Sequence, residues 1–383
     1  MKKNRSSYPW SIAQQYFLHF GIMGVYLPYF NLYCLHIGLS GSEIGTLSSV
    51  RSVSTVVFPV VFGALADRYQ LRKPIYIGCC FIAALTWSFF LQTTDFYRML
   101  LISLVYGMFY APIISFLEAL TMDVLGKEKR SYGTVRAWGS LSFIIIVMLT
   151  GNLTDRFSIR LILIMVLIGS IMQAFFSLKL PFTDRGTTGP SVPKPRLFLH
   201  KPIVIFLSSA FLMLVSHGAY YGFFSIHLEH LGFSNLFIGS VWAIASIAEI
   251  QAMMASKKLF NRFSLEKVLV FSFIVAALRW SILFVVTSPV LIVLAQMLHA
   301  VTYGTFHMAG ILYMDRIAPE EAKTMAQAVN NAVTYGLGLM VGFLLNGYLY
   351  EWVGSAPLFI ISAGIAAMGG MLFAGHLAAA RKT

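Results

Sequence analysis

Charged residues are scarce in this sequence, and their scarcity excludes an ordinary water-soluble fold. Only 11% of the 383 residues are Asp, Glu, Lys or Arg, whereas 58% are hydrophobic and the mean hydropathy is +0.75. Apolar runs of about 20 residues recur along the chain, and each is long enough to cross the roughly 30 Å core of a bilayer. Because these runs do not alternate with polar residues, they exclude a membrane β-barrel. The sequence therefore predicts an all-α multi-pass membrane protein.

Reactive and ligand-binding motifs are also lacking. The three cysteines, Cys34, Cys79 and Cys80, have neither metal-ligand spacing nor a convincing disulfide partner, so we interpret them as small apolar residues. The sequence shows no nucleophile–base pair, phosphate-binding loop, metal cluster or nucleotide motif. These absences argue against an enzyme or an ATP-driven pump, and they predict neither a cofactor nor a metal.

The net charge of +13 is interpreted as a topology signal and not as a nucleic-acid footprint. Most Lys and Arg residues fall in the N-terminus, the even-numbered loops and the C-terminus, whereas only Arg98, Arg156 and Arg160 fall in the odd-numbered loops. This positive-inside distribution predicts that both termini lie in the cytoplasm. The first apolar stretch is too long for a cleavable signal peptide and runs directly into a second span.

The apolar runs divide into two predicted bundles of six helices. The longest polar segment, at 182–202, is rich in Pro and Gly and is typical of a linker. It separates a bundle at 1–181 from a bundle at 203–383. The twelve predicted spans are 9–33, 44–66, 74–92, 97–122, 134–153, 160–181, 203–228, 236–256, 267–286, 289–313, 324–349 and 355–378.

The two halves carry a weak parallel repeat. GALADRYQLRK (63–73) follows span 2, and SKKLFNRFSLEK (256–267) follows span 8. Span 4 ends in Met-Asp at Asp123, and span 10 ends in Met-Asp at Asp315. Such a repeat is typical of transporters built from two similar bundles, with the substrate site near the midplane.

Twelve spans, a central loop and GALADRYQLRK resemble the major facilitator superfamily. The signature between its spans 2 and 3 is matched at Gly63, Asp67, Arg68, Arg72 and Lys73, but Gln70 stands where a glycine is expected. The resemblance implies a cytoplasmic gate, in which Asp67 and the basic residues bridge neighbouring helix ends as the bundles rock. An ordinary charged loop is the alternative interpretation.

Charged residues inside the spans mark a candidate pathway, because an ionised side chain at the bilayer centre costs several kcal/mol unless it is paired or faces a wet cavity. Five are present, and the three Arg outnumber the two Glu, which favours an anionic substrate. They are Arg51, Glu118, Arg136, Glu249 and Arg279. Glu118 and Arg136 form a possible pair on spans 4 and 5, either in the site or as a structural ion pair.

Three ionisable residues on successive spans share one depth. At about 1.5 Å of rise per residue, Glu249, Arg279 and His299 lie roughly 20, 18 and 15 Å into spans 8, 9 and 10. We therefore expect a paired cluster near the midplane, although each residue could be satisfied separately. His19, His217 and His307 also lie within spans. An imidazole can carry or gate a proton near neutral pH, and a hydrogen-bonded packing role is the alternative interpretation.

Tyrosines lie beside polar or proline residues at several span centres. Those proposed to line a substrate cavity are Tyr26, Tyr29, Tyr110 and Tyr221, together with His217. A cavity of this kind suits a substrate with an aromatic ring or several hydroxyl groups. For each tyrosine alone, core packing is an equally good interpretation.

Several stretches narrow the resemblance. YGTVRAWGS (132–140), SHGAYYGF (216–223), GSVWAIASIAEI (239–250), SKKLFNRFS (256–264) and LRW (278–280) resemble the phenylpropionate permease family of bacterial proton symporters, which is close to the oligosaccharide–proton symporters. The likeness implies a multi-pass protein of the bacterial inner membrane that transports a small molecule together with protons and is functional as a monomer.

The resemblance also implies residue roles. The sugar symporters bind substrate with a Glu/Arg pair on spans 4 and 5, which Glu118 and Arg136 match; Arg279 and Trp138 complete the proposed substrate set. Glu249, Arg279 and His299 match their coupling residues on spans 8 to 10, but Thr302 replaces a second carboxylate. Glu249 is therefore the first candidate for the proton carrier, and Glu118 is the second.

The substrate stays open at this point. An aromatic acid such as 3-phenylpropionate is favoured by the surplus of Arg, whereas a sugar, oligosaccharide or nucleoside is favoured by the likeness to the sugar symporters. A membrane sensor that does not transport is a further alternative, and fold analogy alone does not choose among them.

Overall fold

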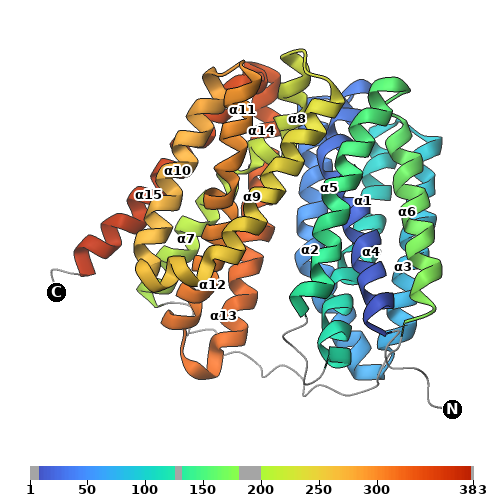
Figure 1. Ribbon diagram of the computed structural model, residues 1–383, viewed down its shortest axis with the longest axis horizontal. Coiled ribbons are helices and arrows are strands. Elements are labelled where there is room, and N and C mark those ends of the chain that lie inside the picture. The colour runs from blue at the N-terminus through green and yellow to red at the C-terminus, as the bar shows by residue number, and fades with distance from the viewer. Residues whose placement is uncertain (1–7, 126–131, 181–199, 381–383) are drawn as a thin grey trace. The chain divides into compact units, whose positions relative to one another are not determined.

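The computed structural model describes residues 8–125, 132–180 and 200–380, and its regular structure there is all helical (Figure 1). Most of the predicted linker at 182–202 lies outside the described residues. The elements that precede it are α1 (Tyr8–His36), α2 (Gly41–Tyr69), α3 (Arg72–Ser88), η2 (Phe89–Gln92), α4 (Phe96–Leu125), α5 (Tyr132–Arg156) and α6 (Leu161–Ser177).

The elements that follow the linker are more often interrupted. They are α7 (Lys201–Ser216), α8 (Gly218–His230), α9 (Asn235–Arg262), α10 (Leu265–Val285), α11 (Pro289–Met297), η5 (Ala300–Thr305), α12 (Phe306–Ile317), η6 (Glu320–Ala322), α13 (Lys323–Asn330), η7 (Asn331–Gly338), α14 (Leu339–Val353) and α15 (Ser355–Ala380). The segments η5 and η7 are π-helices that continue their neighbours.

The predicted membrane spans are confirmed as helices. Ten helical runs in the described part of the chain are long and apolar enough to cross a membrane. The other two predicted spans, 9–33 and 160–181, are occupied by the 29-residue helix α1 and the shorter apolar helix α6. The orientation of the termini stays a prediction.

The helices pack into two units that exchange short segments. Unit 1 holds the described residues of Met1–Leu39, Val53–Pro190 and Ser234–Ser240, and unit 2 holds those of Ser40–Ser52, Ser191–Phe233 and Val241–Thr383. The first turns of α2 therefore belong to unit 2, and the first turns of α9 belong to unit 1. The predicted bundles at 1–181 and 203–383 do not include this exchange and stay a prediction.

Each exchanged segment begins with the same local motif. HIGLSGSEIG (36–45) precedes and opens α2, and HLGFSNLFIG (230–239) precedes and opens α9. Gly38 and Gly232 have φ values of +89° and +83°, which glycine adopts without steric cost. Ser40 and Ser234 then accept hydrogen bonds from backbone N–H groups three residues later, at 3.3 and 3.2 Å. This is a second part of the internal repeat.

A carboxylate binds the start of each exchanged helix. The Oδ1 and Oδ2 atoms of Asp155, at the end of α5, accept hydrogen bonds from the backbone N–H groups of Asn235 and Leu236 at 2.7 and 2.9 Å. Oε1 of Glu351, near the end of α14, accepts one from Ser42 at 2.8 Å. Because a helix N-terminus carries partial positive charge, both contacts stabilise the exchanged segments where they lie.

The interruptions of the helices coincide with close packing. His217 separates α7 from α8, and a Cβ atom on the next residue, Gly218, would overlap the backbone of Gly342. Similarly, a Cβ atom on Gly304 in η5 would lie 2.9 Å from Cγ of Glu249. π-Helical segments such as η5 and η7 often occur at functional sites.

Candidate functional site

Arg279 on α10 is fully buried in unit 2, and its hydrogen-bonding capacity is largely used by neutral groups. Its Nε donates to the carbonyl oxygen of Ala295 at 3.0 Å. One terminal nitrogen donates to Nδ1 of His299 at 3.0 Å and to the hydroxyl of Thr302 at 3.1 Å, and the other donates to Oε1 of Gln296 at 2.9 Å. Four of its five N–H donors therefore have partners.

Aromatic rings enclose the same guanidinium group. Its central carbon lies 4.3 Å from the ring centroid of Tyr220 and 4.6 Å from that of Trp280. Cation–π contacts of this kind stabilise a cation that has been removed from water. Arg279 is thus held as an internal part of unit 2.

The contact with Arg279 fixes the tautomer of His299. Arginine has no acceptor, so Nδ1 of His299 must carry a lone pair, and the ring proton must lie on Nε2. Nε2 faces Oε2 of Glu249 at 3.9 Å. The three residues therefore lie together in the order Arg279, His299 and Glu249, as their common depth predicted.

The carboxylate of Glu249 also lies among phenol groups. Those near enough to interact with it electrostatically are Tyr220, Tyr221, Tyr303 and Tyr335. They come from α8, η5 and η7, so three elements surround this side chain in addition to its own helix, α9. A carboxylate in such a setting can take up a proton without losing its neighbours.

His217, predicted to bind substrate, lies in the same cluster. Its Nδ1 is 2.8 Å from the carbonyl oxygen of Met213, so it donates there, and its ring meets Trp280 edge to face at 5.0 Å. Tyr221 lies 6.1 Å from His217 and 6.2 Å from His299, centroid to centroid. The structure therefore brings together all the predicted site residues of unit 2.

In unit 1, Arg136 lies face to face with an aromatic ring. Its guanidinium carbon is 3.8 Å from the ring centroid of Phe20 and 5.5 Å from that of Tyr16. A Cβ atom on Gly139, one turn later on α5, would lie only 2.6 Å from Phe20 and 3.1 Å from a terminal nitrogen of Arg136. This glycine thus leaves the space in which the arginine and the ring stack.

Glu118 on α4 is near enough to Arg136 to interact with it electrostatically. It lines a pocket of about 520 Å³ with Ser115, Ala119, Met122 and Tyr132. The predicted pair is therefore close in space. The side chain of Glu118 is open to this pocket, as a substrate contact requires.

The tyrosines of unit 1 have different surroundings. Tyr110 stacks on His19 at 4.9 Å and 12°, next to the ring of Phe20. Tyr26 stacks on Phe30 at 4.7 Å within a buried aromatic cluster. Tyr29 is fully buried, and its hydroxyl donates toward the backbone carbonyls of Val147 and Asn235, each 3.0 Å away.

Two of these observations bear on the predicted substrate set. Tyr29 holds the exchanged turns of α9 against α5, and Trp138 packs edge to face on Trp10 at 5.2 Å. Both contacts are packing roles in this structure, and a role of either residue in substrate binding stays a prediction.

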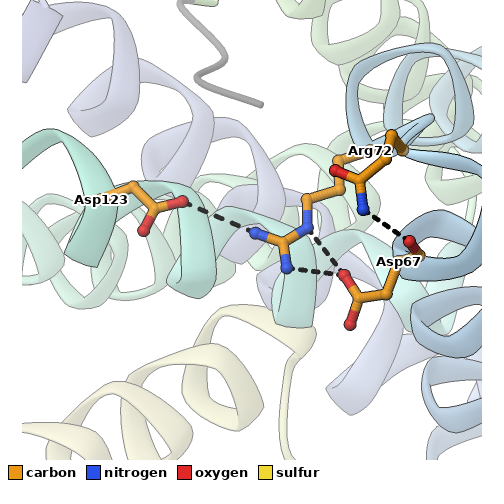
Figure 2. Close-up of polar contacts among 4 residues, drawn as sticks. Asp67, Arg72 and Asp123 are labelled. Carbon is orange, nitrogen blue, oxygen red and sulfur yellow. Dashed lines mark hydrogen bonds and ion pairs between the residues drawn. The ribbon is translucent and has the colours of Figure 1, made fainter. Parts of the chain in front are cut away.

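Two of the predicted gate residues, Asp67 and Arg72, form a connected group with Asp123 (Figure 2). Arg72 at the start of α3 donates from Nε and one terminal nitrogen to Oδ1 of Asp67 at 2.9 and 2.6 Å, and its other terminal nitrogen lies 3.7 Å from Asp123 on α4. Gln70 has a φ of +54°, so it adopts the left-handed conformation expected of the glycine that it replaces. The pairs join α2, α3 and α4 within unit 1.

The remaining gate residues lie around this group. Arg68 is exposed and lies over the ring of Tyr69, 5.5 Å from its centroid. Lys73 follows Arg72 in the first turn of α3. A Cβ atom on Gly63 would have no neighbour within 4 Å, so this glycine is not needed for packing inside unit 1.

The sequence analysis did not identify three groups of residues that surround Arg136, Arg279 and Glu249. Phe20 and Gly139 position Arg136; Thr302 and Gln296 bind Arg279; Tyr303 and Tyr335 surround Glu249. A signal was present for Tyr303 and His307, since they follow His299 at intervals of four residues and therefore lie on one helix face. The others depend on contacts between separate helices.

Three comparisons with known proteins agree with this architecture. The MFS_1 like family matches residues 9–361. The chain is 27% identical over 363 residues to a probable 3-phenylpropionic acid transporter of Escherichia coli (strain K12), covering 92% of this chain and 93% of that protein. It is 25% identical over 352 residues to the maltose permease of Geobacillus stearothermophilus, covering 90% and 89%.

A solved structure shows the same fold. The crystal structure of the nucleoside transporter NupG superposes with a TM-score of 0.87 at 20% identity, covering 96% of this chain and 98% of that one. Relatives named for an acid, a sugar and a nucleoside thus all match over most of their lengths.

Proposed function

We propose that this chain, which belongs to the MFS_1 like family of membrane transporters and is not an enzyme, is a proton-coupled symporter. Its proposed substrate is a small aromatic acid such as 3-phenylpropionate. The name of the acid transporter from Escherichia coli supports this substrate class. The proposal includes alternating access, a monomeric unit and the bacterial inner membrane.

The observation that carries the proton-coupling part is the hydrogen bond from Arg279 to Nδ1 of His299. A second proton on His299 would have to occupy Nδ1, where it would face an N–H group of a guanidinium. Protonation would therefore break that hydrogen bond and place two cations side by side. His299 stays neutral, and Glu249, which its Nε2–H group faces, carries the transported proton.

The two arginines differ in what they offer to a substrate. Arg279 already donates to Ala295, Gln296, His299 and Thr302 and is enclosed by aromatic rings, so it has little capacity to bind a carboxylate. The guanidinium of Arg136 lies over the ring of Phe20 and also contacts the hydroxyl of Tyr132, and its other N–H groups are proposed to bind a carboxylate. Arg136 is therefore the proposed anion-binding residue, and the rings of Tyr110 and His19 lie next to Phe20 for contact with an aromatic group.

A neutral sugar or nucleoside is the second candidate, and Glu118 favours it. This carboxylate is open to the pocket near Arg136, and an ionised carboxylate binds hydroxyl groups well but repels an acid. The maltose permease among the relatives supports the same alternative. In that case Arg136 would neutralise Glu118 and donate to a hydroxyl group.

At the cytoplasmic end, the proposed gate consists of Asp67 and the basic residues of its signature. The contacts of Arg72 with Asp67 and Asp123 join the ends of three helices, as a gate that moves with unit 1 requires. Breaking them would slow the conformational change without altering substrate affinity.

Uptake into proteoliposomes tests the proposal. With an inward-directed proton gradient, radiolabelled 3-phenylpropionate should accumulate, whereas a disaccharide and a nucleoside should not. Glu249→Gln should abolish accumulation but retain exchange of the acid across the membrane. Glu320→Gln, which removes an exposed carboxylate of the same unit, is the matched control and should transport normally.

Substrate recognition is tested in the same vesicles. Arg136→Gln should raise the KM for the acid roughly tenfold or more, since it removes a charge-assisted hydrogen bond. Accumulation of the sugar or the nucleoside alone would replace the acid as substrate. Uphill uptake by Glu249→Gln would refute its role as the proton carrier.

A further inference from the structure

Tyr335 makes polar contacts in two directions. Its hydroxyl lies 2.5 Å from Nδ1 of His307 on α12. Its backbone carbonyl and that of Gly336 accept hydrogen bonds from the hydroxyl of Ser52, at 3.2 and 2.9 Å. Ser52 is the last residue of the part of α2 that belongs to unit 2. Tyr335 therefore lies at the point where α2 leaves this unit.

The side chain of Tyr335 also belongs to the surroundings of Glu249. Its phenol interacts electrostatically with that carboxylate and meets the ring of Tyr303 at 6.1 Å and 82°. Tyr303 stacks in parallel on His299 at 5.2 Å and 9°, and on His307 at 6.2 Å and 6°. A continuous row of rings thus leads from the proposed proton-coupling pair to the hydroxyl of Tyr335.

We propose that Tyr335 is a positioning residue that couples the charge of Glu249 to the attachment of α2 in unit 2. When Glu249 is protonated, the hydroxyl of Tyr335 donates to Nδ1 of His307, the atom that it contacts in this structure, and its backbone holds Ser52. When Glu249 is ionised, its carboxylate is the stronger acceptor and competes for that hydroxyl. The shift of Tyr335 weakens the two hydrogen bonds from Ser52 and loosens the first turns of α2.

The backbone around Tyr335 suits such a movement. Tyr335 lies in the π-helix η7, and Tyr303 lies in the π-helix η5. A π-helix has a wider hydrogen-bonding register than an α-helix and is rarely stable without support from its surroundings. In η7, this support includes the hydroxyl of Ser52 and the contact of Tyr335 with His307.

Other ionisable groups also face Glu249 and belong to its surroundings. His299 faces it from the start of η5, with Arg279 of α10 behind, and Tyr220 and Tyr221 face it from α8. Tyr335 joins Glu249 to α2 through its own side chain and backbone.

The inference rests on Glu249 as the proton carrier, so its test uses a readout that does not require transport. Ser49 lies one turn before Ser52, is buried, and donates a hydrogen bond to the carbonyl oxygen of Met340. A Ser49→Cys variant therefore reports loosening of α2 by its rate of reaction with a small water-soluble maleimide. The natural cysteines are buried, and the parent chain serves as the blank.

The labelling rate is measured between pH 5 and pH 9 in membranes without substrate. Because thiolate formation alone speeds this reaction as pH rises, each rate is divided by that of an exposed reference cysteine, Glu320→Cys, at the same pH. The normalised rate of the reporter should be higher at high pH. Tyr335→Phe, which removes one hydroxyl, should reduce this pH dependence about fivefold, the effect of one hydrogen bond on an equilibrium. His307→Gln should reduce it in the same way. Tyr313→Phe is the matched control, because this buried tyrosine lies near Glu266 and Arg316 and not near Glu249.

Two results separate this inference from the proposed function. If Glu249→Gln removes the pH dependence but Tyr335→Phe and His307→Gln retain it, the role of Tyr335 is refuted and that of Glu249 stands. If Glu249→Gln retains the pH dependence, the proton carrier lies elsewhere and both proposals fail. Ser52→Ala should raise the labelling rate about fivefold at every pH, since it removes the attachment itself.

Discussion

At Gln70, in the turn between α2 and α3, glycine is predicted to be more stable than alanine, which is the reverse of their order within a helix. Gln70 is exposed and has a φ of +54°, a conformation that costs a residue with a Cβ atom about 1–2 kcal/mol. Its Nε2 donates a hydrogen bond to the carbonyl oxygen of Asp67 at 2.7 Å, which returns about 0.5–1 kcal/mol at an exposed site. The strain and the hydrogen bond therefore nearly balance.

Replacements at Gln70 should separate the strain of the left-handed backbone from the contribution of the side-chain hydrogen bond. Gln70→Gly removes both, so its free energy of unfolding should equal that of the parent or exceed it by up to about 1 kcal/mol. Gln70→Ala loses the hydrogen bond but keeps the strain and should destabilise by about 1 kcal/mol. Gln70→Val adds a β-branch in the same conformation and should cost about 2 kcal/mol or more.

Thermal unfolding in detergent at one scan rate measures the series, with apparent Tm shifts on the order of 2 °C per kcal/mol. The control is Met254, which is 81% exposed in the middle of α9. There, glycine should be about 1 kcal/mol less stable than alanine, the usual order in a helix. If alanine were also the more stable residue at position 70, the left-handed turn would be refuted.

Three further changes have distinct expected outcomes. Arg279→Lys leaves several buried acceptors without donors and should cost about 3–5 kcal/mol, measured as a loss of folded protein on size-exclusion chromatography. Asp155→Asn should lower the apparent Tm, because one carboxylate oxygen becomes an amide nitrogen that cannot accept from the backbone N–H group of Asn235 or Leu236. Gly239→Ala should impair folding, because the new Cβ atom would overlap Tyr29 and the backbone of Val147; Gly63→Ala, which meets no neighbour within 4 Å, should fold normally.

The spans were predictable from sequence because length and apolar character decide whether a helix can cross a bilayer. The interruptions within three of them were not predictable. The break at His217 depends on the contact of Gly218 with Gly342, residues that are far apart in the sequence. A local pattern contains no information about such a contact.

The exchange of helix starts between the units shows the same limit. The motifs at 36–45 and 230–239 resemble each other, so a second repeat could have been found in the sequence. The sequence does not reveal that Asp155 binds the second motif and that Glu351 binds the first. Those contacts depend on how the helices pack.

In the candidate site, depth predicted the meeting of Glu249, Arg279 and His299, because residues at one depth on successive helices can reach each other. Thr302 could not be interpreted in that way. From the sequence alone, Thr302 is only the residue that stands where the resemblance leads one to expect a carboxylate. In the structure, its hydroxyl accepts a hydrogen bond from Arg279. Only the complete set of acceptors shows that this arginine needs no carboxylate in direct contact.

The charges of Glu249 and Arg279 in unit 2 suggest how proton binding and substrate binding could be coupled. Glu249 is the carboxylate that faces the Arg279–His299 pair, so its protonation leaves the charge of Arg279 without a counterion there. At an effective dielectric constant of 20, one charge contributes about 1.7 kcal/mol to the binding of an opposite charge about 10 Å away, or roughly tenfold in affinity. If Glu249 carries the proton and the acid binds within this range of Arg279, protonation favours the acid and has no such effect on a neutral sugar. By this argument Glu249→Gln, with its permanently neutral side chain, should bind 3-phenylpropionate at least as tightly as the parent chain at high pH, even though it does not accumulate it. Weaker binding by that variant would mean that the acid and the proton are not linked through the charge of Arg279.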